Sequence, residues 1–345
     1  MGHNIFDLCP FWVLYHSLKS MSSKQIDFSN VLNDDQVYGY ILNHYETLGK
    51  DWIAHQWTWM NAVYQPFGDH YKYLILISLI EKTLQLYDEV DITFTYDQYY
   101  SKSYLQIDKF SVTELCEKLN LPKETVRRKV LELEKLGVIK RRKKQVIIDR
   151  AAFPFIKPQN QINFTSKYIY LFAEKLNKKK VLSKKLDRKF ITNIIKSNFT
   201  LCWRWYFNMQ IPMIIGYNKY FKDTCAFHIW GTVVMNQAFN YSKNFKKSDI
   251  YQLTPDKISF NESFTRQGKE KNGVSAMSIS DMTGIPRASV VRKCKYLMKT
   301  GYLSLNDKKQ YLLTGLNLSN LVSFQKEIFK FKAKFIRKIL NLCNI

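Results

Sequence analysis

One segment of about 40 residues occurs twice in this chain, and this repeat constrains the fold more than any other feature. The first copy contains LPKETVRRKVLELEKLG at 121–137, and the second contains IPRASVVRKCKYLMKTG at 285–301. The helical parts align without a gap at an offset of 164 residues. The recurring positions are Ser111, Pro122, Val126, Arg128, Lys129, Leu133, Lys135 and Gly137, matched by Ser275, Pro286, Val290, Arg292, Lys293, Leu297, Lys299 and Gly301.

A weaker match lies upstream of each copy. The motif Trp57-Thr-Trp59 recurs as Trp203-Arg-Trp205 at an offset of 146 residues, and an apolar helical stretch and a long connection follow each motif. Together the two matches predict an internal duplication in which each half contains a helical lead-in and a compact unit.

Each compact unit is predicted to contain two helices, a tight turn between them and a β-hairpin after them. In the first copy Ser111 is a suitable N-cap, and Glu114 three residues later would complete a capping box. Pro122 suits the first turn of the second helix, and Gly137 is a typical helix stop. Three apolar residues recur on one face of that helix: Val126, Val130 and Leu133. Helix, turn, helix and hairpin together predict a winged helix-turn-helix.

The spacing L-x-L-P-K-x-T-V-R-R-x-V-x-x-L-x-x-x-G-V-I at 119–139 resembles the winged-helix domains of bacterial repressors of the GntR and MarR types. The resemblance implies that the second helix enters the major groove while the wing contacts the DNA backbone or minor groove. Carried over by position, it assigns DNA contacts to Lys123, Thr125, Arg127, Arg128 and Lys129 with wing residues Arg141, Arg142 and Lys143, and to Arg287, Ser289, Arg292 and Lys293 with wing residues Lys308 and Lys309.

The distribution of charge favours a polyanionic partner. Residues 1–100 carry a net charge of −7 and residues 101–345 carry +31, within a total of +24. Lysine enrichment from an AT-rich genome would act along the whole chain, so it does not predict an acidic first third and a basic remainder. The alternative is that the basic residues only form solvated helix faces.

The expected fold class is mainly α with small β-wings. The expected organisation has six segments: an acidic N-terminal helical region (1–68), a first winged-helix domain (69–150), a linker (151–167), a basic helical region (168–222), a second winged-helix domain (223–315) and a C-terminal amphipathic helix (316–345).

The expected function is sequence-specific binding of double-stranded DNA, with the two winged helices acting as a pseudo-dimer on an asymmetric site in transcription regulation. Two alternatives stay open: a plasmid-type or phage-type replication initiator with paired winged helices, and a winged-helix scaffold for protein interactions. Glycine-rich phosphate-binding and nucleophile motifs are absent from the sequence, so no enzymatic activity is expected.

The remaining sequence features predict no cofactor, metal or membrane partner. The six cysteines form no CxxC pair, and the six histidines form no HExxH or HxH pair. The longest strongly apolar run, 73–80, is much shorter than the roughly 20 residues of a membrane span. We therefore expect a cytoplasmic, nucleoid-associated protein. Self-association through the C-terminal helix or the N-terminal region is a further expectation.

Overall fold

The computed structural model describes residues 32–108, 110–149, 152, 157–178, 182, 185–244, 273–314 and 318–344. Within these ranges the chain is mainly helical, with one three-stranded and one two-stranded antiparallel sheet. The predicted mainly α fold class with small β-sheets is confirmed in this form. The first 31 residues of the expected N-terminal region, and residues 245–272 of the expected second winged-helix domain, lie outside the described residues.

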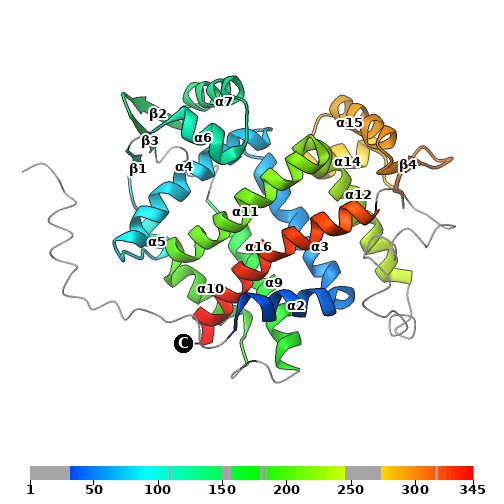
Figure 1. The fold of residues 1–345 in the computed structure, drawn as a ribbon, viewed down its shortest axis with the longest axis horizontal. Coiled ribbons are helices and arrows are strands. Elements are labelled where there is room, and N and C mark those ends of the chain that lie inside the picture. The colour runs from blue at the N-terminus through cyan, green and yellow to red at the C-terminus, as the bar shows by residue number, and fades with distance from the viewer. Residues whose placement is uncertain are drawn as a thin grey trace, which may run out of the picture.

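Two helical hairpins form the centre of the molecule (Figure 1). One consists of α3 (Tyr45–Tyr64) and α4 (His70–Glu89), and the other of α11 (Phe199–Phe221) and α12 (Thr224–Asn244). They are packed crosswise, because the second helix of each hairpin lies against the first helix of the other, α4 against α11 and α12 against α3. The C-terminal helix α16 runs along α11 and also packs against α2. The helices of this central body are α2 (Asp34–Asn43), α3 (Tyr45–Tyr64), α4 (His70–Glu89), α11 (Phe199–Phe221), α12 (Thr224–Asn244) and α16 (Leu318–Asn344).

Helix α4 shows how the sequence produces this centre. The Asp69 side chain caps its N-terminus by accepting hydrogen bonds from the backbone N–H groups of Tyr71 and Lys72, at 2.8 and 3.1 Å. Every residue from 73 to 80 is buried, so this run is apolar on all sides. A helix that is apolar all round must be enclosed by other elements, and α4 contacts α3 and α11 as well as α6 (Val112–Leu119) and α7 (Lys123–Lys135).

Two compact units project from this body, and they lie along the upper edge of the view in Figure 1. The first consists of β1 (Tyr104–Ile107), α6 (Val112–Leu119), α7 (Lys123–Lys135), β2 (Ile139–Arg142) and β3 (Gln145–Asp149), with strand order β1-β3-β2. The second consists of α14 (Ala276–Thr283), α15 (Arg287–Lys299), β4 (Leu303–Leu305) and β5 (Tyr311–Leu313). In the second unit a single bridge between Val274 and Tyr311 takes the place of the β1–β3 pairing.

Strand β1 was not expected from the sequence, which suggested only a long connection before the first compact unit. The strand contains only four residues, YLQI, and its two buried side chains, Leu105 and Ile107, alternate with exposed ones. Such a short alternation gives little signal by itself, and β1 is stabilised by its pairing with β3. A short helix, α5 (Tyr96–Tyr100), also lies in this connection.

The expected linker at 151–167 is partly helical, which corrects that expectation. Helix α9 (Gln159–Asn177) begins directly after Pro158 and continues into the region that was predicted to be helical. Ile162 and Ser166 are completely buried, and α9 packs against α3, α10 (Arg188–Ser197) and α16. The prolines therefore precede the helix and do not mark a domain boundary at 167.

Helices from several of the expected domains share one core. The boundaries at 68 and 222 fall at the turns of the two central hairpins, yet α3 packs against α12 and α4 packs against α11 across them. The apolar face of α16, which suggested chain pairing, is covered by α2, α9, α10 and α11 of the same chain. Its residues Phe335, Ile336, Ile339 and Leu340 are buried there.

The two Trp-x-Trp motifs do not occupy equivalent positions. Trp57 lies seven residues before the end of α3 at Tyr64, whereas Trp203 lies eighteen residues before the end of α11 at Phe221. Trp59 and Trp203 are both buried, as expected for core residues. The upstream motif therefore gives no support for an internal duplication.

Candidate nucleic-acid interface

The turn between α6 and α7 is built from residues suited to their backbone positions. Ser111 caps α6 by accepting a hydrogen bond from the backbone N–H of Glu114 at 3.3 Å. The Glu114 carboxylate instead accepts hydrogen bonds from Lys82 Nζ, so the predicted capping box is only half formed. Asn120 ends α6 in the left-handed region at φ +51°, which asparagine tolerates better than most residues. Pro122 then starts α7.

Helix α7 has one buried face and one exposed basic face. Its buried residues, Val126, Val130 and Leu133, are those predicted from the sequence. On the opposite side Lys123, Arg127 and Arg128 are exposed, and Thr125 is half-buried. The structure thus brings four of the predicted DNA-contacting residues onto the first two turns of α7.

Two glutamates of α7 neutralise part of this charge. Arg127 pairs with Glu124 at 2.9 Å, and Arg128 approaches Glu132 at 3.8 Å. These are exposed pairs on one helix, for which typical contributions to stability are about 0.3–0.5 kcal/mol. Both guanidinium groups are therefore available to a stronger partner, such as a phosphate or the O6 and N7 acceptors of a guanine.

Lys129 lies outside this exposed basic face. Its side chain is 12% exposed, and its ammonium group contacts Asp69 at 2.7 Å and Glu132 at 2.9 Å. Burial opposes the charged form of Lys129, but the hydrogen bonds to Asp69 and Glu132 raise its pKa above the usual value. Lys129 therefore joins α7 to the N-terminus of α4. This structural contact accounts for a lysine at this position without any contact to DNA.

The hairpin β2–β3 places a basic tip beside α7. Arg142, Lys143 and Lys144 are exposed, and Lys143 adopts the left-handed conformation of the turn at φ +55°. Arg141 donates a hydrogen bond to Glu134 at 2.6 Å. This bond lowers the pKa of the Glu134 carboxyl and raises the pKa of Arg141. Arg141 thus fastens the hairpin to α7, whereas the other three cations extend into solvent.

The second unit has the same local geometry at corresponding positions. Gly284 ends α14 in the left-handed region at φ +74°, and Pro286 starts α15. The buried face of α15 contains Val290, Cys294 and Leu297. The predicted contact residues Arg287 and Arg292 are exposed, Ser289 is half-buried, and Lys308 and Lys309 are exposed at the tip of the β4–β5 hairpin.

The second unit also repeats the lysine–aspartate contact. Lys293, whose side chain is 22% exposed, pairs with Asp223, and Asp223 accepts a hydrogen bond from the backbone N–H of Ala226 at the start of α12. Each unit therefore uses one lysine of its second helix to hold the N-terminus of a central helix. Unlike α7, α15 contains no acidic residue, and no carboxylate of the described residues lies within ion-pair distance of Arg287 or Arg292.

Residues 103–146 match the family model of the DeoR-like helix-turn-helix domain. The matched range contains β1, α6, α7, β2 and the start of β3, so it supports a winged helix-turn-helix DNA-binding domain at this place. The match names the DeoR-like type, whereas the sequence suggested the GntR and MarR types, and it does not extend to α14–β5. Comparisons with curated proteins and with solved structures found no match.

A cleft lies between the N-termini of α4 and α12, beside the second unit. The first residues of both helices line it, together with Ser289 and Arg292 of α15. Behind the cleft, His70 Nε2 donates a hydrogen bond to His228 Nδ1 at 3.1 Å, and His228 Nε2 donates one to Asn61 Oδ1 at 2.7 Å. Burial lowers the pKa of His70 to about 3, and burial and then His70 lower that of His228 well below its usual value.

Sequence reasoning missed the two aspartates and the histidine pair. Asp69 and Asp223 precede apolar helices, and their position as caps could be recognised from that alone. Their lysine partners lie 60 and 70 residues away in the chain, and the two histidines are 158 residues apart. No local pattern reports contacts at these separations.

Two further observations concern other classes of function. No helix in the described ranges is both long and apolar enough to cross a membrane. In the same ranges no three histidine, cysteine, aspartate or glutamate side chains come together as a metal site.

Proposed function

We propose that this chain binds double-stranded DNA through two winged helix-turn-helix units and acts as a transcription regulator. The observation that carries the proposal is the paired geometry of α7 and α15. Each follows a left-handed turn residue and a proline, buries an apolar face, anchors one lysine to an aspartate and exposes arginines on its first two turns. We infer that the second unit arose by duplication of the first, although the family match covers only the DeoR-like domain.

We further propose that one chain acts as a pseudo-dimer on an asymmetric site. Both units project from the same crosswise helical body and lie along one edge of the molecule (Figure 1). Their contact residues differ, with Lys123 and Thr125 in α7 where α15 has Arg287 and Ser289. Since arginine, lysine, serine and threonine make different contacts with base edges, the two half-sites should differ. A regulator of this kind would act in the cytoplasm, where it is bound to the DNA of the nucleoid.

The test begins with selection of bound fragments from random DNA, followed by measurement of the dissociation constant by fluorescence anisotropy. The double variant Arg128→Ala/Arg292→Ala should lose about 100-fold or more in affinity, because a good arginine–guanine pair contributes roughly 1–3 kcal/mol. The matched control is Lys135→Ala/Lys299→Ala, which removes exposed lysines at equivalent positions of the last helical turns. It should reduce affinity much less.

Two outcomes would contradict the proposal. Unchanged DNA binding by the arginine double variant at moderate salt would argue against both units as DNA readers and would favour a protein-interaction role. A selected site that is a strict palindrome, with each chain supplying one unit, would contradict the pseudo-dimer. Mass measurement of the complex gives the number of chains per site directly.

A further inference from the structure

A groove lies where α11 and α16 run side by side (Figure 1), and Lys118 of α6 also lines it. Its cavity has a volume of about 370 Å³ and is partly open to solvent. Small-molecule sites typically have roughly 300–1,000 Å³, mostly apolar walls and a few polar groups. The groove is therefore large enough to hold a small organic molecule.

The walls of this groove are mainly apolar. The ring of Phe331 is 38% exposed here, although a large apolar side chain gains free energy when it is covered. The apolar residues that line the groove are Trp205, Met209, Ile211, Pro212, Phe331 and Phe335. Three of these six residues are aromatic, so the groove suits a ligand with a flat apolar body.

Two lysines of α16 line the same groove and have no acidic partner. Lys334 and Lys338 are four residues apart, so they lie on the same face of the helix. No carboxylate of the described residues lies within ion-pair distance of either ammonium group. The other cations close to them are paired: Lys118 with Glu81, Arg204 with Asp88 and Arg337 with Asp34.

The ammonium group of Lys338 is in an unfavourable place for a positive charge. It is half-buried, and its Nζ lies 5.1 Å from the centre of the Trp205 ring. Burial, together with the charges of Lys334, Arg337 and Arg204, lowers the pKa of Lys338 to about 8, and Asp34 opposes this shift. An anion bound beside Lys338 would favour its charged form and offset the cost of this crowding.

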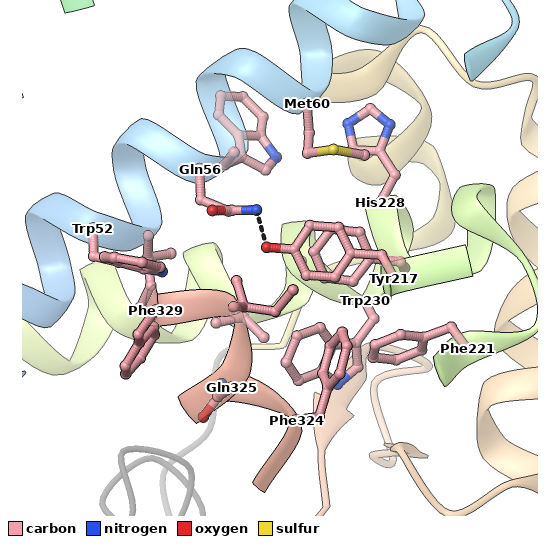
Figure 2. A pocket seen from close by; sticks show the side chains of 16 residues that line it. Trp52, Gln56, Met60, Tyr217, Phe221, His228, Trp230, Phe324, Gln325 and Phe329 are labelled. Atoms are coloured by element: carbon pink, nitrogen blue, oxygen red, sulfur yellow. Dashed lines mark hydrogen bonds between the residues drawn. The ribbon is translucent and has the colours of Figure 1, made fainter. Parts of the chain in front are cut away.

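A second pocket, where α3, α11, α12 and α16 meet, does not share these properties (Figure 2). Its volume is only about 60 Å³, and no lysine or arginine is among the residues that line it. Across it the Gln56 amide donates a hydrogen bond to the Tyr217 hydroxyl. The groove between α11 and α16 therefore combines volume, apolar walls and unpaired positive charge, which this pocket lacks.

We propose that the groove between α11 and α16 binds a small aromatic carboxylate. Its apolar body covers Phe331 and packs beside Trp205, and its carboxylate pairs with the ammonium groups of Lys334 and Lys338. The site is separate from the proposed DNA-contacting residues, and its test uses no DNA.

The first experiment compares indole-3-acetate with indole-3-acetamide by titration calorimetry on the full chain. The two molecules have the same shape and the same number of non-hydrogen atoms, but only the acetate is charged. Indole-3-acetate should bind about tenfold more tightly, because only its carboxylate forms charge-assisted hydrogen bonds with the two lysines. Equal affinities, or no binding of indole-3-acetate at millimolar concentration, would overturn the proposal.

The second experiment removes the two positive charges. In Lys334→Gln/Lys338→Gln the preference for indole-3-acetate should disappear through about tenfold weaker binding of the acetate, with little change for the acetamide. The melting temperature should stay the same or rise, because the variant removes a charge that burial and neighbouring cations disfavour.

The matched control is Lys326→Gln/Lys330→Gln. These two lysines of α16 are also four residues apart and exposed, but they do not line the groove. This variant has the same net charge as Lys334→Gln/Lys338→Gln and should keep its affinity for indole-3-acetate. An equal loss of affinity in both variants would overturn the proposal, because the overall charge of the chain and not the groove would then attract the anion.

Discussion

The DeoR-like domain and the α14–β5 unit share their turn geometry but present charge differently. Helix α7 carries three glutamates, Glu124, Glu132 and Glu134, and each lies near a basic side chain of the same unit. Helix α15 has no acidic residue, so Arg287 and Arg292 face solvent without a carboxylate partner among the described residues. Equal numbers of basic residues along two helices therefore do not mean equal charge available to a partner.

The β-hairpins also differ in exposed charge, but here the DeoR-like domain exposes more basic residues than the second unit. The DeoR-like domain has a three-stranded sheet whose tip exposes Arg142, Lys143 and Lys144. The second unit has two short strands, with Lys308 and Lys309 at the tip. We therefore expect α15 to contribute more to base recognition, and the wing of the DeoR-like domain to contribute more to phosphate contacts and salt dependence.

The largest expected difference between the units is in single arginine variants. Arg292→Ala should weaken specific DNA binding by about 10- to 100-fold, since its guanidinium group is free to pair with a base. Arg128→Ala should weaken binding less, because Glu132 lies 3.8 Å from its guanidinium group and competes with the DNA. Anisotropy titrations with the selected fragment measure both. A larger loss for Arg128→Ala would reverse the assigned roles of the two helices.

The second prediction concerns the hydrogen-bonded pair His70 and His228, which joins α4 to α12. The pKa of His70 is about 3 in the folded chain, whereas an unfolded histidine titrates near 6.5. Between these values the unfolded chain binds more protons, so the free energy of unfolding falls as pH falls. For His70 the loss from pH 6.5 to pH 5 should be about 1.6 kcal/mol, because the unfolded histidine is already half protonated at pH 6.5 and the slope reaches 1.36 kcal/mol for each pH unit only at lower pH.

The variant His70→Gln tests this pH dependence. Glutamine keeps an N–H donor for His228 but does not titrate, so the fall in unfolding free energy between pH 6.5 and pH 5 should become smaller by about a third. The rest comes from His228 and from the buried His55, because burial lowers the pKa of both well below the usual value. Urea unfolding at several pH values gives the slope. His44→Gln, outside this pair, serves as the control. An unchanged slope in His70→Gln would show that the loss of stability at low pH comes from the titration of other groups.

The third prediction tests whether the two lysine–aspartate contacts are equivalent. Lys129→Met and Lys293→Met should each lower the free energy of unfolding by about 1–2 kcal/mol, because each leaves a partly buried aspartate without its hydrogen-bonded cation. Their DNA affinities should change by less than about threefold, since neither ammonium group lies on the exposed face. If either variant lost as much DNA affinity as Arg292→Ala, that lysine would belong among the DNA-contacting residues after all.

The sequence predicted the parts of this fold that depend on local pattern. The buried valines and leucine of α7 follow directly from their helical spacing. Arg128 and Arg292, which we propose as DNA-contacting residues, are exposed, as the helical spacing also predicts.

The features that the sequence did not predict depend on pairing over long distances. Strand β1 is defined by β3, about 40 residues later in the chain. The recurrence of lysine at positions 129 and 293 suggested DNA contact, but it reflects two aspartates at the N-termini of other helices. A recurring residue in a repeat can thus preserve a contact inside each unit as readily as a contact with a partner.

The smallest expected effect lies in the turns themselves. Asn120 and Gly284 hold equivalent left-handed positions, at φ +51° and φ +74°. Gly284→Ala should lower the free energy of unfolding by about 1 kcal/mol, because a Cβ atom crowds the backbone in this conformation. Asn120→Gly should change it by no more than about 0.5 kcal/mol, since asparagine already tolerates the left-handed region and glycine mainly adds freedom to the unfolded chain. Urea unfolding of both variants at one pH measures the difference, and equal losses would mean that the two turns are not conformational equivalents.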